Sequence, residues 1–217
     1  MINSKLIYKI LGQLLFIEAF LLFVSLLVAY YYQQDDIFAF VVATLTTIGG
    51  GLILKWKGHG ADNSMSRRDA YLVVSLSWII FSLFGTLPFM VSGYINNFTD
   101  AYFETMSGFT TTGATILDDV ECFPHGLLFW RSLTQWIGGL GIIMFTIAVL
   151  PIFGVSGLQV FAAEASGPTH DKVHPRIGIT AKWIWGIYTG LTFILVILLM
   201  LGGMNWFDSI CHAFATT

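Results

Sequence analysis

A short run of threonines around one glycine, Thr110–Thr115 (Thr-Thr-Thr-Gly-Ala-Thr), has the clearest chemistry in this sequence. A dehydrated monovalent cation needs a cage of oxygen atoms in place of its water, and backbone carbonyls supply one without adding fixed charge. Aiming several carbonyls inward requires an unusual backbone conformation, which glycine adopts readily because it has no Cβ. The run therefore predicts a cation-selectivity filter in which Gly113 permits the bend.

The residues before this run predict how it is placed. Phe98–Phe109 is a moderately apolar stretch of twelve residues, and such a helix rises about 18 Å. That is too short to cross a hydrocarbon core of about 30 Å. Irregular backbone at membrane depth is tolerated only where protein buries it or where it lines a water-filled cavity. We therefore expect a half-helix that enters the membrane, followed by a pore-lining loop, with the negative end of the helix dipole near Phe109.

The composition places the whole chain in a membrane. Of 217 residues, 56% are hydrophobic and only 11% are charged, against roughly 25% charged in soluble domains. The net charge of -3 argues against nucleic acid as a partner. Five runs are long enough to cross the bilayer as helices: Leu11–Tyr32, Ile37–Trp56, Tyr71–Val91, Gly126–Phe153 and Trp183–Gly203. The first is too long and ends too bulky for a cleaved signal peptide, so we interpret it as a retained span.

The charged residues predict the orientation. Of the ten Lys and Arg, all except Arg131 fall in the N-terminus, at the very end of the second run, or in the loops that follow the second and fourth runs. If the runs alternate, these segments share one side, which the positive-inside rule makes cytoplasmic. The opposite side has no Lys or Arg, and a cation pathway should have such an acidic outer mouth. Its acidic residues are Asp35, Asp36, Asp100, Asp118, Asp119 and Glu121.

A weak internal repeat adds to the argument. Phe98-Thr99-Asp100 returns 108 residues later as Trp206-Phe207-Asp208, in the pattern aromatic, any residue, acid, each shortly after a span. A second filter would then begin just after Thr217, so we interpret the chain as part of a longer protein. The predicted organisation is two N-terminal spans (1–57), a cytoplasmic loop (58–70), a first pore repeat (71–153), a second cytoplasmic loop (154–182) and the start of a second pore repeat (183–217).

These motifs together resemble the bacterial Trk-type potassium uptake proteins, the TrkH membrane subunits of the Trk/Ktr/HKT superfamily. Phe103–Thr115 is similar to the family's first pore loop. Phe129-Trp130-Arg131 and Gln135–Ile142 (Gln-Trp-Ile-Gly-Gly-Leu-Gly-Ile) resemble the helix that follows it. His212–Thr217 (His-Ala-Phe-Ala-Thr-Thr) resembles the opening of the second pore loop. The resemblance extends over the whole chain and covers about half of a family member.

The resemblance implies an all-α polytopic membrane protein of span–pore-loop–span repeats like a potassium-channel pore, preceded by two extra spans. It implies potassium uptake across the bacterial inner membrane with the N-terminus cytoplasmic, no enzymatic activity and no organic cofactor. It also implies a homodimer and a cytoplasmic nucleotide-binding regulatory ring, the TrkA type. The filter carbonyls fall on Thr111 and Thr112, which would hold K⁺, with Gly113 as the filter glycine and Thr110 beside them.

Three further interpretations concern residues outside the filter. Arg131 lies within the fourth run, where a charge is costly, and it either pairs with Glu104 behind the filter or reaches the interface. Glu18 in the first span is expected to face protein or an interface. Gly138, Gly139 and Gly141 permit either a close approach of helices or a bend in the fourth run.

Two alternatives stay open. Potassium channels carry two glycines in the filter whereas this loop has one, so a sodium-permeable or sodium-coupled transporter of the same architecture is the first. The second, remote, is an intramembrane serine protease, because Gly154–Gly157 (Gly-Val-Ser-Gly) has the GxSG form; no span carries a histidine to act as the base. The five histidines follow no metal-ligand spacing, and Cys122 and Cys211 fit no disulfide framework.

Overall fold

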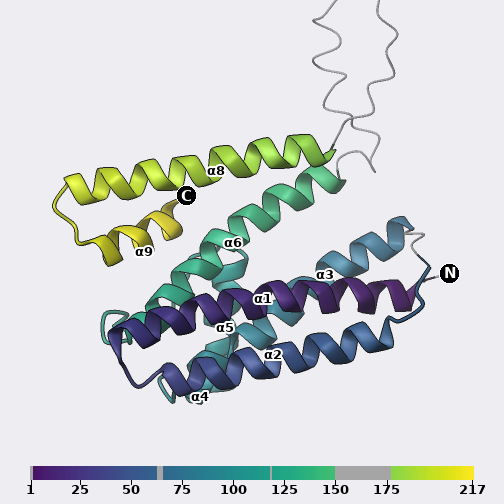
Figure 1. The fold of residues 1–217 in the computed structure, drawn as a ribbon, viewed down its shortest axis with the longest axis horizontal. Coiled ribbons are helices and arrows are strands. Elements are labelled where there is room, and N and C mark those ends of the chain that lie inside the picture. Colours follow the sequence, from purple (N-terminus) through teal and green to yellow (C-terminus); the bar gives the residue numbers. More distant parts are fainter. Residues whose placement is uncertain (1, 63–65, 118, 150–176) are drawn as a thin grey trace, which may run out of the picture.

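The computed structural model is all-helical over the residues it describes, which are 2–62, 66–117, 119–149 and 177–217 (Figure 1). Its helices are α1 Ser4–Tyr32, α2 Ile37–Lys57, α3 Arg67–Gly85, α4 Leu87–Val91, α5 Phe98–Phe109, α6 His125–Val149, α8 Ile177–Leu201 and α9 Trp206–Thr216. Four helical segments in this part of the chain are long and apolar enough to cross a membrane: Ser4–Tyr32, Ile37–Lys57, Arg68–Val91 and Lys182–Leu201. Helix α6 has 25 residues, which span about 37 Å. The predicted all-α membrane class is confirmed.

Helices α1 and α2 form an antiparallel pair at the N-terminal side of the chain. Helix α1 begins at Ser4, seven residues before the expected start, because the Asn3 side chain accepts a hydrogen bond from the Leu6 N–H (3.2 Å) and caps it. The pair packs closely: a Cβ on Gly12 would lie 2.9 Å from the Gly51 carbonyl oxygen. Glu18 is 1% exposed, so its expected contact with protein is confirmed.

The predicted third span is broken in two. Helix α3 ends at Gly85 and α4 begins at Leu87, with Pro88 in its first turn. Proline has no N–H and its ring clashes with the preceding turn, so it interrupts the helix here. The indole N–H of Trp130 on α6 donates to the Gly85 carbonyl (2.9 Å) and satisfies it. The break thus becomes a fixed contact with the next long helix.

One end of the molecule gathers the N-terminus, the end of α2 and the start of α3 (Figure 1). The Asn3 N–H donates to the carboxylate of Asp69 (2.9 Å) in the first turn of α3. A Cβ on Gly58, just after α2, would lie 2.5 Å from the Lys9 nitrogen. Two of the three predicted basic segments therefore meet at this end. The third, 154–182, lies almost entirely outside the described residues.

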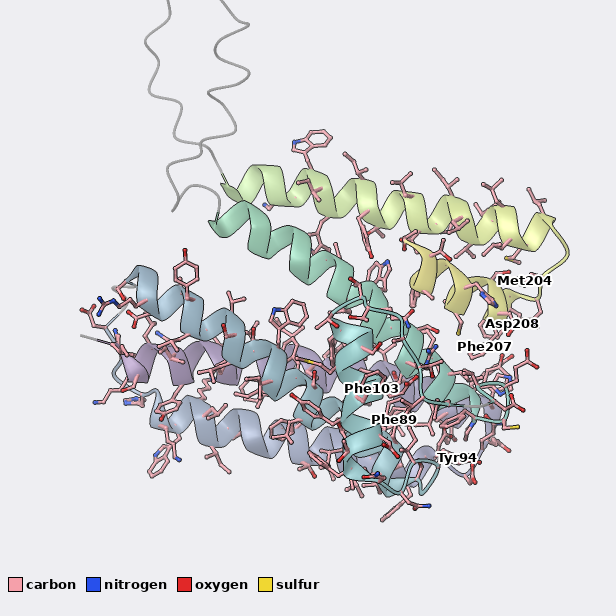
Figure 2. The ribbon with its side chains drawn as sticks, turned by 180° about the vertical axis from the view of Figure 1, so that it is seen from behind. Phe89, Tyr94, Phe103, Met204, Phe207 and Asp208 are labelled. Carbon is pink, nitrogen blue, oxygen red and sulfur yellow. The ribbon has the colours of Figure 1, made fainter. Side chains whose placement is uncertain are left out.

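The two short helices α5 and α9 both pack against α6. Figure 2 shows Phe89 and Phe103 near α5, and Phe207 and Asp208 at the start of α9. Phe109 and Trp130 are buried where α5 meets α6, with their rings edge to face at 6.2 Å. Helix α6 is therefore the element that positions both half-helices.

Candidate ion-selectivity filter

The half-helix before the filter covers Phe98–Phe109, the same residues as the predicted one. The Asn97 side chain accepts a hydrogen bond from the Thr99 N–H (3.0 Å) and so caps its start. Asp100 lies in the first turn, where an acid meets the positive end of the helix dipole. The opposite, negative end of the dipole lies at Phe109, directly before the predicted filter.

The loop after α5 folds back onto the last turn of the helix. The Thr111 N–H donates to the Gly108 carbonyl (2.9 Å), and the Thr112 N–H donates to the Ser107 carbonyl (3.0 Å). The backbone φ is +55° at Thr111 and +70° at Gly113. The chain therefore takes the left-handed conformation twice within three residues.

Thr111 is the more unusual of these two positions. A β-branched residue with positive φ is a conformational outlier, and such strain costs about 1–3 kcal/mol and concentrates at functional sites. The Thr111 hydroxyl donates to the Thr110 carbonyl (2.7 Å), which helps to hold the conformation. The sequence gives no sign of this, because threonine ordinarily avoids positive φ.

The carbonyl oxygens of the loop divide into two groups. Those of Thr110 and Ala114 accept hydrogen bonds, from the Thr111 hydroxyl (2.7 Å) and the Ser107 hydroxyl (2.6 Å). The carbonyls of 111–113 accept none within the described part of the chain, and residues 111–113 are exposed. Oxygens that are exposed and unengaged are the kind that can replace the water of a cation.

Thr110 differs from its neighbours because its hydroxyl points back to the helix. It donates to the Met106 carbonyl (2.8 Å) and lies 2.8 Å from the hydroxyl of Thr112. This geometry makes Thr110 a link between α5 and the loop rather than a free oxygen ligand.

The predicted pair of Glu104 and Arg131 is formed. The Arg131 Nε donates to Glu104 Oε1 at 2.9 Å, and the Glu104 side chain is 1% exposed against 18% for Arg131. The same carboxylate accepts hydrogen bonds from the Thr115 hydroxyl (2.7 Å) and the Ile116 N–H (3.3 Å). One buried carboxylate on α5 therefore joins α6 to the far side of the filter loop.

Two glycines bring α5 and α6 into direct contact. A Cβ on Gly138 would lie 2.1 Å from the Phe109 carbonyl oxygen, and one on Gly108 would lie 2.3 Å from the Thr134 hydroxyl. Gly139 and Gly141 face Tyr188 and Trp78 in the same way. Of the two interpretations of the glycines on α6, these contacts favour close approach. Sequence reasoning missed that Gly138 meets the end of the half-helix, since a spacing of glycines names no partner.

The acidic face is smaller than predicted, because Asp36 does not belong to it. Asp36 is 0% exposed, and its carboxylate Oδ2 accepts a hydrogen bond from the Leu127 N–H (3.2 Å) at the start of α6. Asp35 beside it is exposed. Asp100 is half-buried and both Asp119 and Glu121 are exposed, while Asp118 lies outside the described residues.

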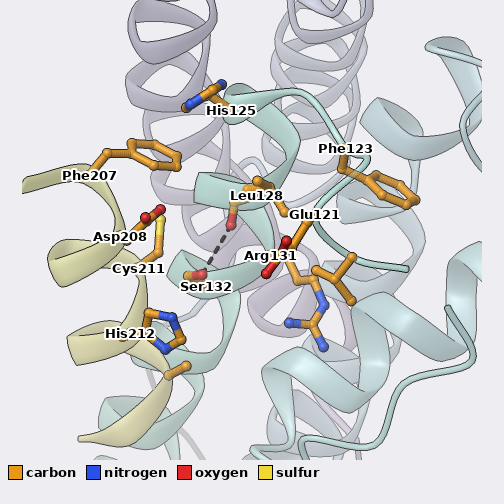
Figure 3. Close-up of a pocket in the computed structure, with 12 residues that line it drawn as sticks. Glu121, Phe123, His125, Leu128, Arg131, Ser132, Phe207, Asp208, Cys211 and His212 are labelled. Atoms are coloured by element: carbon orange, nitrogen blue, oxygen red, sulfur yellow. Dashed lines mark hydrogen bonds between the residues drawn. The ribbon is translucent and has the colours of Figure 1, made fainter. Parts of the chain in front are cut away.

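The second half-helix, α9, also begins directly after a capping asparagine. The Asn205 side chain accepts a hydrogen bond from the Asp208 N–H (2.8 Å), as Asn97 does for Thr99. With the offset of 108 residues, His212 takes the place that Glu104 has on α5. A pocket of about 490 Å³ lies between α9, α6 and the loop before α6 (Figure 3).

This pocket brings together two histidines that the sequence shows only as scattered. His125 and His212 line it with Glu121, Asp208 and Arg131. Within the described ranges, no group of three or more His, Cys, Asp and Glu side chains could hold a metal ion. Both cysteines are free, and Gly154–Gly157 lies outside the described residues.

The comparison with protein families decides to which family the chain belongs. The family model described as "TrkH: Cation transport protein" matches residues 33–216. The chain belongs to the TrkH family. The resemblance inferred from the motifs is thereby confirmed.

Individual relatives agree with the family. The chain is 38% identical over 216 residues to "Trk system potassium uptake protein TrkH" of Halomonas elongata, covering 99% of this chain and 45% of that one. It is 40% identical over 216 residues, with the same coverage, to the protein of that name from Escherichia coli K12. The crystal structure of the potassium transporter TrkH from Vibrio parahaemolyticus is similar with a TM-score of 0.83 and 33% identity, covering 97% of this chain and 42% of that one. The chain spans less than half the length of these TrkH proteins.

Proposed function

We propose that this chain forms part of a potassium uptake pore in a bacterial inner membrane, and that the carbonyls of Thr111 and Thr112 bind K⁺. Gly113 is the filter glycine, and Thr110 ties the loop to α5. The observation that carries this assignment is the exposed loop of residues 111–113, which has two positive φ angles and carbonyls that accept no hydrogen bond within the described part of the chain. The ion is inferred from the TrkH relatives, which are named as potassium uptake proteins.

The mechanism follows from electrostatics and coordination. The outer, acidic face raises the local concentration of cations. A cation then exchanges part of its water for filter carbonyls, while the negative end of the α5 dipole at Phe109 stabilises it. No covalent bond forms or breaks, so the chain acts as a conductor of ions rather than an enzyme, and needs no organic cofactor.

The proposed organisation assigns α1 and α2 to two extra spans before the pore. Residues 71–153 form the first pore repeat, with its filter at 110–115, and 183–217 begin the second. The resemblance to TrkH proteins implies that four such loops close the filter, and residues 110–115 are one of them. The matching caps at Asn97 and Asn205 support the repeat.

The proposed orientation has the N-terminus and the basic loops 58–70 and 154–182 in the cytoplasm, by the positive-inside rule. The gathering of the N-terminus with the end of α2 supports a shared side. The proposed partners are the lipid bilayer, a second copy in a homodimer and a cytoplasmic nucleotide-binding regulatory ring of the TrkA type. The word "system" in the names of the relatives fits a membrane subunit with regulatory partners.

A matched pair of glycine substitutions tests the filter. Gly113 has φ +70° and Gly60 has φ +71°, and a Cβ on either would meet nothing within 4 Å. Alanine therefore costs the same backbone strain at both, about 1–2 kcal/mol, but only Gly113 lies in the filter. In proteoliposomes of the intact protein, Gly113→Ala should lower the ratio of Rb⁺ to Na⁺ uptake and Gly60→Ala should not. An equal response of both variants contradicts the assignment.

The sodium-permeable alternative is favoured by one feature, the single glycine of the filter. The same assay on the unchanged protein separates the two: equal uptake of Rb⁺ and Na⁺ would establish the alternative and exclude potassium selectivity. The remote protease hypothesis is tested with Ser156→Ala. We expect this variant to keep full Rb⁺ uptake, whereas loss of a proteolytic activity in the variant would support the protease hypothesis.

A further inference from the structure

The start of α6 has no capping side chain of its own. Helix α6 begins at His125, after Cys122-Phe123-Pro124, and none of these is a residue that caps helices well. The first N–H groups of a helix have no partner inside it. Another part of the chain must therefore satisfy them.

The turn between α1 and α2 supplies these acceptors from 91 residues away. The His125 N–H donates to Gln34 Oε1 (2.6 Å), and the Leu127 N–H donates to Asp36 Oδ2 (3.2 Å). The ring of His125 stacks on that of Tyr32 with centroids 3.9 Å apart. Figure 1 shows this turn beside the start of α6. The turn between the two N-terminal spans thus holds the start of α6.

The contact is tight and specific to Asp36. A Cβ on Gly126 would lie 2.2 Å from Asp36 Oδ2 and 2.8 Å from the Ala29 Cβ. Asp36 is the N-cap residue of α2, yet its side chain makes no capping bond to α2. The second oxygen, Oδ1, has no hydrogen-bond partner in the described part of the chain. A buried carboxylate directed away from its own helix has a role in the helix that it contacts.

A continuous set of contacts leads from Asp36 to the filter. Arg131 lies four residues after Leu127 on α6, one turn along the same face. Its Nε donates to Glu104 (2.9 Å), and Glu104 accepts from the Thr115 hydroxyl (2.7 Å) at the end of the filter loop. Fixing the start of α6 therefore fixes the arginine that holds the carboxylate behind the loop.

We propose that Asp36, with Gln34, is a positioning residue for the filter, acting through the start of α6 and the Arg131–Glu104 pair. The two N-terminal spans then serve ion selection although they lie outside the pore repeats. This inference rests on the proposed function, because it assumes that the loop of residues 111–113 selects K⁺.

The test compares Rb⁺ and Na⁺ uptake by the intact protein at matched amounts in the membrane. Asp36→Ala removes the acceptor and should lower the Rb⁺ to Na⁺ uptake ratio about fivefold, as for the loss of one helix cap. Asp36→Asn keeps an oxygen acceptor and should restore most of the ratio. Phe38→Leu, in the first turn of α2 and 69% exposed, is the control and should leave the ratio unchanged.

If Asp36→Ala is not recovered from membranes, Gln34→Ala carries the test, since Gln34 is only half-buried. It should lower the same ratio by a smaller factor. An unchanged ratio in a well-expressed Asp36→Ala, or in Gln34→Ala when that variant carries the test, overturns the inference. So does a fall in Asp36→Ala that Asp36→Asn does not restore. Failure of the unchanged protein to prefer Rb⁺ instead overturns the proposed function.

Discussion

Removing both members of the Glu104–Arg131 pair should impair ion uptake less than the two single losses combined. Arg131→Met leaves the Glu104 carboxylate 1% exposed and without its cation, and breaking a buried pair from one side costs about 3 kcal/mol. Glu104→Gln keeps the volume but has one acceptor oxygen in place of the two that receive Thr115 and Ile116, while Arg131 at 18% exposed retains some contact with water. We therefore expect Glu104→Gln to cost about 2 kcal/mol, as for the loss of one charge-assisted hydrogen bond.

A double-mutant cycle on initial Rb⁺ uptake at matched protein amount measures the coupling. Once both partners are gone, no charge is left unpaired, so the coupling energy should be about 2 kcal/mol. At 1.36 kcal/mol per factor of ten, the double variant should be about 30-fold more active than the product of the single effects predicts. Arg68 is the control, because it is exposed and lies at the end of α3 that is far from the filter. The effects of Glu104→Gln and Arg68→Met on uptake should multiply. Multiplicative effects for Glu104 and Arg131 as well would refute direct coupling.

Three further predictions follow from single contacts. Gly138→Ala puts a Cβ 2.1 Å from the last carbonyl of α5 and should destabilise the protein by about 1–3 kcal/mol through overpacking, seen as a lower melting temperature in detergent. Gly186→Ala, with open space around its Cβ, should leave the melting temperature unchanged. Equal shifts in the two variants would contradict the close packing at Gly138. Burial raises the pKa of Asp36 above its ordinary value of 3.8, so the folded state holds this proton more tightly than the unfolded chain does. The stability gained from this difference is complete below pH 3.8 and is lost as the pH rises through the raised pKa. Asp36→Asn should therefore lessen the fall in melting temperature as the pH rises above about 4, and an unaltered slope would count against this effect. The Cys122 thiol donates to the Asp119 carboxylate (2.8 Å), which raises the pKa of Cys122. Because Asp119→Asn removes this effect, a membrane-impermeant maleimide should label Cys122 faster in that variant in intact cells. Labelling only after the cells are opened would reverse the proposed orientation.

The sequence by itself determined most of the elements and the place of the proposed filter. Helix α5 ends where a run of threonines and one glycine begins, and its asparagine cap and length are local properties of Asn97–Phe109. Apolar runs of sufficient length become helices in a membrane because the backbone has no other partner there. The family, too, could be inferred from the spacing of the pore-loop residues, since those residues are neighbours in the chain.

Only the tertiary structure decided how these elements support the filter. The positive φ of Thr111 opposes the local preference of threonine, and it is found where the loop folds back and bonds to the last turn of α5. Asp36 seemed from the sequence to be part of an acidic surface, yet it is buried against Leu127, 91 residues away. The ion pair of Glu104 and Arg131 was one of two possibilities until α5 and α6 were placed side by side. Contacts between distant segments depend on which helix faces meet, and a single sequence specifies those only through the folded chain.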